Sequence, residues 1–544
     1  MSRFSRSWVS DLTDPVTSPA TNSGRSAVYA PRGVAATSHP LATGAAVRVL
    51  ESGGNAFDAA VTAAAVLNVV EPHMTGAGGD MFAILWVEAE KRLVGLDAMG
   101  RSGSKTDWQA LSEAGSQDVP SEGARSITVP GALSGWNALV ETYGTMTLQE
   151  VLEPAIRLAE GGFPVSPIVA ANWAKQAPAL RANEGAAKTF LIGGEAPKTG
   201  EWFTNADLAG TLRHIAEEGI GTFYGGELGE RIVAGIDELG GYITLDDLNS
   251  HECRWVEPLS IDYKGYALHE LPPAGQGIGA LQMLKMLEGV DLQSMGRHSA
   301  EYLHTTIEAK KLAYADLARH VADPDHMDVQ PAALLDDDYL AERAGLIDPG
   351  AAAVRPNPGR PATEAETIYM TVADQYGNMI SFINSLYGAF GSHVVVPGTG
   401  LALQNRGAGF TMEEGHPNQI APNKRPYHTI IPAFVTRGGE PWLSYGVMGG
   451  AMQPQGHVQV LLNIVEFGMD VQEAIDAPRF RHYEGQSVAV ENLAKDVAHR
   501  LESLGHELRD EPGGSFGGGQ AIQRLTRGWV AGSDPRKDGM AAGH

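Results

Sequence analysis

The sequence predicts a protein of the α/β (α+β) class, with helices and buried strands packed around a large core. Of its 544 residues, 43% are apolar and 19% are charged, which is too few charges for a disordered chain. Helix-capping signals and short candidates for buried strands alternate along the chain. At roughly 150 residues per domain the length allows three or four domains, but one large α/β domain also fits.

The first ordered elements are expected after a polar N-terminal segment. Residues 1–32 predict a flexible arm, and ordered structure is expected from about Gly33. Asn55 is a good N-cap for the Ala-rich helix that includes 59–70, because its side chain can accept a hydrogen bond from the free N–H groups of the first turn. Further predicted elements are a buried strand at 81–87, a helix that follows the capping box 147–150 and ends at 161–162, another helix start at 244–247, and mainly helical structure over 287–318.

A Pro-rich segment divides the chain. Residues 350–366 predict an exposed linker, and 368–373 predict a strand directly after it. Residues 374–378 form a turn signal, and 379–384 predict the returning strand. A single threonine, Thr367, therefore lies where a linker meets a sheet. Taken alone, such a residue most simply begins a strand.

Charge and cysteine content exclude several classes of function. Lys and Arg number 40 against 65 Asp and Glu, a formal charge of −25, which argues against binding to nucleic acid or to an anionic membrane. One cysteine, Cys253, excludes an intramolecular disulfide and any multi-cysteine metal site. The apolar run 59–70 is too short to span a bilayer, and the polar start shows no secretory signal. We therefore expect a cytoplasmic protein that binds no membrane.

Two other enzyme classes have weak signals. Residues 513–517 spell G-x-S-x-G, but a nucleophile elbow needs a strand before it and a helix after it, and here Pro512 precedes and further glycines follow. The histidines form no H-E-x-x-H motif, and His320 and His326 flank what we interpret as a solvated acidic loop. No Walker A motif is present. The sequence therefore predicts no metal and no cofactor.

Short motifs spread over nine-tenths of the chain carry a family resemblance. In their shared order and spacing they resemble the γ-glutamyltransferase superfamily of N-terminal-nucleophile hydrolases, which are made as one chain that cuts itself in two. The resemblance implies a four-layer αββα sandwich. The motifs are 53–60 (GGNAFDAA), 70–72 (VEP), 76–79 (GAGG), 129–131 (VPG), 262–266 (DYKGY), 271–273 (LPP), 374–378 (DQYGN), 424–426 (KRP), 449–450 (GG), 476–480 (DAPRF) and 533–536 (SDPR).

Thr367 matches the nucleophilic threonine of the superfamily. The resemblance implies cleavage between Glu366 and Thr367, which gives a large fragment, 33–366 after the arm, and a small fragment, 367–544. The two would remain together as a heterodimer, which could assemble further. Cleavage frees an α-amine that titrates near ~7.7–8.0, so one residue can supply both the nucleophile and its base.

Other residues match supporting positions of the superfamily. Gly449 and Gly450 match a pair of oxyanion-binding glycines, whose amides can approach the substrate closely because they lack a Cβ. Ser385 matches a hydroxyl residue bonded to the nucleophile, and the hairpin from 368 to 384 would bring the two together. The plain alternatives are an ordinary Gly-Gly turn and a surface serine.

The residues that would grip a γ-glutamyl group are largely replaced. We expect Arg406, His428 and Arg101 to form a different anion site beside Thr429, with Tyr387 narrowing the pocket. The plain alternatives are a surface salt bridge for Arg406 and a hydrogen-bonded core position for His428. The positions that match the γ-glutamyl contacts hold Asp97, Tyr387, Gly409, Arg406 and the pair His428–Thr429.

The combination resembles a divergent branch that includes cephalosporin-acylase-like and oxamate-amidohydrolase-like proteins. The resemblance implies an amidohydrolase that acts on a small amide bearing a carboxylate. The alternatives are a true γ-glutamyltransferase or glutathione hydrolase, a cephalosporin or glutaryl acylase, and an inactive homologue with a binding role.

Overall fold

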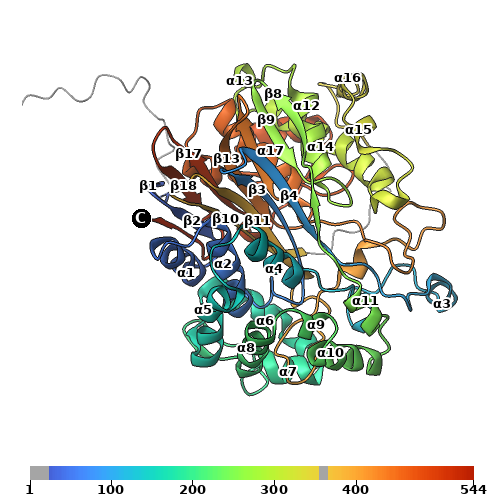
Figure 1. The fold of residues 1–544 in the computed structure, drawn as a ribbon. Helices are drawn as coiled ribbons and strands as arrows, with labels where there is room; N and C mark the ends of the chain where they lie inside the picture. The colour runs from blue at the N-terminus through green and yellow to red at the C-terminus, as the bar shows by residue number, and fades with distance from the viewer. Residues whose placement is uncertain (1–23, 355–364) are drawn as a thin grey trace, which may run out of the picture.

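Two seven-stranded antiparallel sheets stack face to face at the centre of the computed structural model, which describes residues 24–354 and 365–544 (Figure 1). In spatial order, the first sheet contains β1 (Val28–Ala30), β18 (Trp529–Ser533), β17 (Gly518–Arg524), β13 (Glu440–Met448), β12 (Ala433–Arg437), β9 (Tyr266–Glu270) and β8 (Leu259–Tyr263). The second contains β19 (Met540–Gly543), β2 (Val34–Thr37), β10 (Ala365–Ala373), β11 (Met379–Gly388), β3 (Asp80–Val87), β4 (Arg92–Ala98) and β7 (Arg254–Val256).

Helices cover the outer face of each sheet (Figure 1). The second sheet is covered by α1 (Pro40–Glu51), α2 (Ala56–Val70) and α4 (Ala132–Tyr143), with α5 (Leu148–Gly161) and α8 (Ala206–Glu218) outside them. The first sheet is covered by α12 (Gly277–Leu287), α17 (Met452–Val465) and α18 (Val471–Asp476), with α14 (Ala300–His320) against α12. The arrangement confirms the four-layer αββα sandwich.

The remaining elements complete the fold. They are α3 (Trp108–Glu113), α6 (Pro167–Arg181), α7 (Glu184–Phe190), α9 (Gly221–Tyr224), α10 (Glu227–Glu238), α11 (Leu245–Asn249), α13 (Leu292–Met295), α15 (Pro331–Leu334), α16 (Asp337–Ala344), α19 (Lys495–Ser503), β5 (Phe163–Pro164), β6 (Trp202–Phe203), β14 (Phe480–His482), β15 (Ser487–Val490) and β16 (Glu507–Leu508). No helix in the described part of the chain has both the length and the apolar character needed to cross a bilayer.

Helix α2 shows why the Ala-rich run forms a helix rather than a strand. Asn55 accepts hydrogen bonds from the first-turn amides of Phe57 and Asp58, and Asp58 accepts in return from the Asn55 N–H, a complete capping box. Every residue of α2 is buried, because the helix lies between the second sheet and neighbouring helices. A helix that is apolar all round is stable only in such a place.

The N-terminal boundary differs from the expected one. Strand β1 pairs with β18 over three residues, so ordered structure begins before Gly33. The expected boundary at residue 32 falls after this strand, and residues 1–23 of the expected arm lie outside the described residues. The same holds for 355–364 of the expected linker. Thr367 lies inside β10, which begins earlier than the strand expected at 368.

Candidate active site

Thr367 and Ser385 meet across the β10–β11 hairpin. The Thr367 hydroxyl donates a hydrogen bond to Ser385 Oγ at 3.2 Å, and both side chains are fully buried. The β10–β11 register shifts between Glu366 and Ile368, so β11 carries an extra residue opposite Thr367. Such a bulge redirects a side chain that would otherwise alternate regularly. The expected proximity of the two residues is present, and their catalytic roles remain predictions.

The predicted oxyanion glycines form a sharp turn between β13 and α17. Gly449 has φ = 120° and Gly450 has φ = 57°, a backbone that residues with a Cβ rarely adopt. The Gly449 carbonyl accepts a hydrogen bond from Met452 N at 3.0 Å. Because C=O and N–H point in opposite directions in a trans peptide, this bond orients the Gly450 N–H. The N-terminus of α17 also favours negative charge at this turn.

Contacts between the two sheets relate β10, which carries Thr367, to β13, which leads into this turn. The ring of Tyr369 fills the space beside Gly446, where a Cβ would come within 2.5 Å of the ring. Two residues further along β10, Thr371 Oγ1 shares a hydrogen bond with Ser444 Oγ of β13, on the other sheet, at 2.7 Å. The facing residues on β10 and β13 therefore run in opposite directions along the two strands. If this pairing continues for two more residues, Thr367 comes opposite Met448, the last residue of β13, and we expect the 449–451 turn to lie beside it.

Arg406 is a fully buried arginine with an open edge. Its Nη1 donates to Thr429 Oγ1 at 2.8 Å, and its guanidinium carbon lies 4.7 Å from the centre of the Tyr387 ring. Its Nε and Nη2 have no hydrogen-bond partner among the described residues. Burial lowers the pKa of Arg406 to about 10, so it stays charged at neutral pH. Nε and Nη2 share one edge of the guanidinium, the edge that takes a carboxylate through two parallel hydrogen bonds.

Asp80, at the start of β3, lies opposite Ser385 in the β11–β3 register. Its Oδ1 accepts hydrogen bonds from the amides of Gly100 and Gly131 and from Gln404 Nε2, each at 3.1 Å. Burial raises the pKa of Asp80 to about 7, although the Arg406 charge opposes the shift. Asp80 is thus a carboxyl whose charge changes near neutral pH, beside the buried cation.

His428 lies on the other side of Asp80. Its Nε2 is 3.1 Å from Asp80 Oδ2, and its Nδ1 accepts a hydrogen bond from Ile430 N, so the proton is assigned to Nε2. Burial, followed by the Arg406 charge, holds the pKa of His428 well below its usual value. His428 is therefore neutral and hydrogen bonded within the core. Its contact with the group around Arg406 runs through Asp80, and it carries no charge there.

Arg101 is not part of this buried group. Its side chain is half-exposed, and it donates to the carbonyl of Asn423 at 2.7 Å, with Asp325 at 3.9 Å. The position that matches the carboxylate-gripping arginine of the superfamily holds Asp97, whose carboxylate pairs with Arg254. Of the expected anion-site residues, Arg406, Thr429 and Tyr387 come together, His428 adjoins them through Asp80, and Arg101 lies apart.

Sequence reasoning missed Asp80 and Gln404. Asp80 follows the glycine run 76–79 and begins a buried strand. A buried acid needs a polar partner, so this position in the sequence could have identified Asp80 as part of a site. No local pattern pointed to Gln404, because its hydrogen-bond partner, Asp80, lies 324 positions away in the chain.

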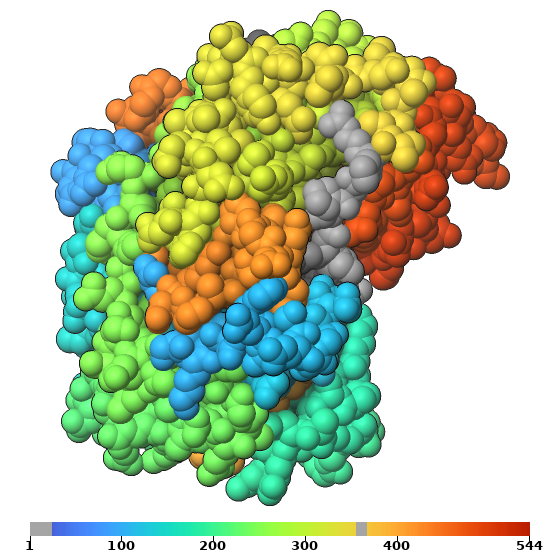
Figure 2. All heavy atoms as spheres, turned by 90° about the vertical axis from the view of Figure 1, so that its right-hand side faces the viewer, coloured from blue at the N-terminus to red at the C-terminus, as the bar shows by residue number. Residues whose placement is uncertain are grey.

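A small apolar cluster joins the α3 region to the segment that follows Arg406 in the chain. It consists of Leu111, Val119, Phe410 and Ile420. Figure 2 shows the two contributing segments, the α3 region and the segment after 405, side by side on one face of the molecule. The indole N–H of Trp108 donates to the carbonyl of Met412 and joins them further. This face of the molecule is therefore made from chain on both sides of the expected cleavage point.

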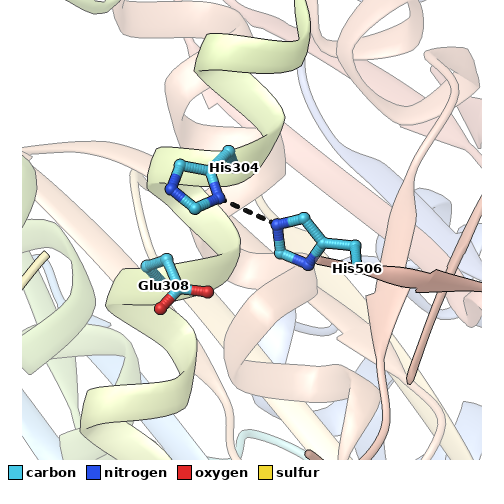
Figure 3. A group of neighbouring side chains, drawn as sticks. All are labelled: His304, Glu308 and His506. Carbon is cyan, nitrogen blue, oxygen red and sulfur yellow. Dashed lines mark hydrogen bonds between the residues drawn. The ribbon is translucent and has the colours of Figure 1, made fainter. Parts of the chain in front are cut away.

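One group of metal-ligating residue types lies together elsewhere in the described residues. His304 and Glu308 lie one turn apart on α14, and His506 faces them (Figure 3). His304 Nδ1 and His506 Nε2 share a hydrogen bond at 2.8 Å. The Glu308 oxygens lie 2.7 Å from Lys311 Nζ and 3.1 Å from the N–H of Ala353. Protein groups already occupy these atoms, and Lys311 supplies the positive charge. The group holds the chain that leads into the expected linker.

The G-x-S-x-G segment is not a nucleophile elbow. Gly513–Phe516 form a short 3₁₀ turn, and strand β17 rather than a helix follows it. The Ser515 hydroxyl donates to Glu511.

Comparisons with known proteins agree with this architecture. The family model described as gamma-glutamyltranspeptidase matches residues 42–544. The glutathione hydrolase-like YwrD proenzyme of Bacillus subtilis is 38% identical over 93% of this chain and 97% of its own. The oxamate amidohydrolase proenzyme of Klebsiella pneumoniae is 36% identical over 94% of this chain and 98% of its own. The crystal structure of cephalosporin acylase from Bacillus halodurans superposes with a TM-score of 0.91 at 41% identity and covers 98% of this chain and 99% of that one. Fold, site and comparisons together establish that the chain belongs to the γ-glutamyltranspeptidase family.

Proposed function

We propose that the protein is an autoprocessing amidohydrolase that uses the N-terminal threonine of its small fragment to hydrolyse amides of a small carboxylate-bearing acid. The observation that carries the proposal is the buried Thr367–Ser385 hydrogen bond at 3.2 Å, beside a row of groups that leads to the open edge of Arg406. Similarity to proteins named as proenzymes supports the self-cleavage step.

Self-cleavage uses the same hydroxyl as turnover. In the uncut chain, Thr367 Oγ1 attacks the carbonyl carbon of Glu366, the C–N bond breaks, and the acyl group moves from nitrogen to oxygen. Water then hydrolyses the ester and leaves a carboxylate on Glu366 and a free α-amine on Thr367. Ser385 accepts the hydrogen bond of the nucleophile and holds its rotamer during the attack.

In turnover, the freed α-amine takes the hydroxyl proton while Oγ1 attacks the amide carbonyl of the donor. The N–H groups of Gly449 and Gly450 stabilise the oxyanion, and loss of one such donor costs on the order of 3 kcal/mol in comparable sites. The proton passes to the departing amine. Water then releases the acid from the acyl-threonine and restores the enzyme.

Arg406 defines the donor we favour. Its unfilled edge fits one carboxylate, and the aromatic face of Tyr387 leaves a narrow space beside it. The alternative γ-glutamyl donor needs a cation at position 97, where this chain has an aspartate paired with Arg254. Hydrolysis is favoured over transfer, because the sequence shows no acceptor site. Cytoplasmic location and further assembly of the fragment pair stay predictions.

The substitution Thr367→Ala tests the proposal. We expect it to leave one uncut chain with no amidase activity, whereas the wild type gives two fragments and a new N-terminus at Thr367. Gel electrophoresis, N-terminal sequencing and a donor screen with oxamate, a glutaryl amide, glutamine and glutathione provide the measurements. Thr371→Ser, on the same strand, keeps the hydroxyl that bonds Ser444; it is the control and should still be cut.

Three outcomes contradict the proposal in different ways. If Thr367→Ala still hydrolyses a donor, Thr367 is not the nucleophile. Turnover of glutathione alone by the wild type favours a glutathione hydrolase. An uncut wild type that hydrolyses none of the donors favours the inactive homologue.

A further inference from the structure

Gln276 lies between the two halves of the candidate site. It precedes α12, is fully buried, and belongs to the expected large fragment. Its side-chain amide donates two hydrogen bonds, to the carbonyl of Thr429 at 2.5 Å and to the carbonyl of Gly450 at 2.9 Å. Its Oε1 accepts from the hydroxyl of Tyr427 at 3.1 Å, and its backbone N–H donates to the carbonyl of His428 at 3.0 Å. The amide group is thus fully used.

The two carbonyls that accept from Gln276, those of Thr429 and Gly450, belong to different parts of the candidate site. Thr429 holds Nη1 of Arg406 and so fixes the cation that faces the expected carboxylate. Gly450 is the second glycine of the 449–451 turn. Its carbonyl belongs to the peptide that joins it to Ala451, so the bond from Gln276 limits rotation about ψ of Gly450, next to the Gly450 N–H. One NH₂ group therefore sets the distance between the carboxylate end and the oxyanion end of a bound donor.

The turn is held by several hydrogen bonds. Gly449 and Gly450 both have positive φ and no side chain, so hydrogen bonds to their carbonyls limit the backbone. Met452 N donates to the Gly449 carbonyl at 3.0 Å, and Gln453 N donates to the Gly450 carbonyl at 3.2 Å. The third carbonyl of the turn, that of Ala451, accepts from the hydroxyl of Tyr314 and from Gln455 Nε2. Gln276 differs from these supports because its second bond leads to the Arg406 wall.

We infer that Gln276 is a positioning residue, which ties the 449–451 turn to the Arg406–Thr429 wall across the boundary between the two fragments. The inference rests on the proposed function and adds to it the residue that sets the geometry between its two ends. Transition-state stabilisation needs donors held within a few tenths of an ångström of the oxyanion. Loss of Gln276 should therefore lower kcat more than it raises KM.

Gln276→Met tests the inference, since it keeps the shape of the side chain and removes its donors. We expect kcat to fall about 10- to 100-fold, less than the 10²–10³ for deletion of an oxyanion donor, with KM within about threefold of the wild type. The control is Gln282→Met on the same helix. Gln282 is also fully buried and also makes two donor bonds, but to Asp316 and Leu334. Its loss should lower the melting temperature and leave kcat within about twofold.

Gln276→Glu provides a second readout that does not depend on the methionine variant folding well. A carboxylate would repel both carbonyls, whereas its protonated form can donate one hydrogen bond. The ratio of variant to wild-type kcat should therefore rise as pH falls from 8 to 5.5. The inference is overturned, while the proposed function stands, if Gln276→Met has the same kcat as Gln282→Met. It is also overturned if the kcat ratio of Gln276→Glu to wild type does not change with pH. A wild type that hydrolyses no donor overturns both.

Discussion

Arg406 illustrates at the scale of one residue how burial and hydrogen bonding together indicate a ligand. A buried guanidinium with two donors left unpaired destabilises a fold by several kcal/mol unless something fills them. Here Thr429 and Tyr387 hold the group on one edge and one face, and the remaining edge has the geometry of a carboxylate partner. The same residue types on an exposed loop would carry no such implication.

Arg406→Lys should raise KM for carboxylate-bearing donors about 10- to 100-fold and change kcat much less. Lysine keeps the charge but lacks the rigid fork that holds both carboxylate oxygens. Steady-state kinetics give the measurement, and a donor whose carboxylate is masked as an amide is the control, since its KM should not respond. An unchanged KM for the carboxylate donor would assign Arg406 a purely structural role. Arg101→Met, measured in parallel, should leave KM within about twofold, because its side chain points to Asn423.

Asp80 predicts a pH dependence of stability. Its pKa is raised in the fold to about 7 by burial, from an unfolded value near 4. Between these values the folded chain keeps the proton that the unfolded chain loses, so the free energy of unfolding falls as pH rises from 4 to 7 and levels off above. The contribution is of order 4 kcal/mol at most. The measurement is denaturant unfolding at a series of pH values, for Thr367→Ala and for the double variant Thr367→Ala/Asp80→Asn. The free energy of unfolding should fall from pH 4 to 7 more steeply in the variant that keeps Asp80. Equal pH dependence in the two variants would contradict the prediction.

At the scale of elements, the β10–β13 contact decides whether nucleophile and turn meet. The fit depends on Gly446, which leaves room for the Tyr369 ring, and the Tyr369 hydroxyl is fixed by Ser381 at 2.7 Å. A buried ring tied at its far end cannot move aside without shifting a strand.

Gly446→Ala should therefore lower the free energy of unfolding by about 1–3 kcal/mol and slow self-cleavage, because the two sheets must separate beside Thr367. Chemical denaturation and a time course of fragment appearance are the measurements. Gly210→Ala is the control: Gly210 lies in α8 with open space around it, and alanine there should stabilise by up to about 1 kcal/mol. If Gly446→Ala is cut as fast as the wild type, the inter-sheet register does not control cleavage.

At the scale of the whole molecule, the expected fragments are interleaved. Strands β2, β3, β4 and β7 of the second sheet come from the chain before Thr367. Strands β11 and β19, and all of β10 from Thr367 onward, come from the small fragment. The first sheet is mixed in the same way. Each fragment alone would leave several strand edges unpaired.

Self-cleavage should therefore leave one particle. Size-exclusion chromatography of the cut protein under native conditions should give the elution volume of uncut Thr367→Ala, while denaturing gels show two fragments of about two thirds and one third of the chain. Renaturing either fragment alone should yield aggregate. Recovery of one soluble, folded fragment would contradict the interleaved architecture.

Local features could be predicted from the sequence, whereas long-range contacts could not. The Asn55 cap and the Thr147 capping box depend on residues three apart, and both are present. The Thr367–Ser385 pair was within reach because one hairpin joins the two residues. Asp80 with His428, and Gln276 with Gly450, join residues 348 and 174 positions apart, and no local pattern encodes such meetings. The half-exposed position of Arg101 likewise follows from where a distant loop lies.

The complete burial of Thr367 before the cut has a consequence for how activity arises. If Thr367 is the nucleophile, as we propose, its hydroxyl is closed off from solvent and cannot react with a donor from outside, so the first bond each molecule breaks should be its own. Activation is then a unimolecular event with a fixed half-life, the same in a dilute sample as in a crowded one, and no molecule can hasten its neighbour.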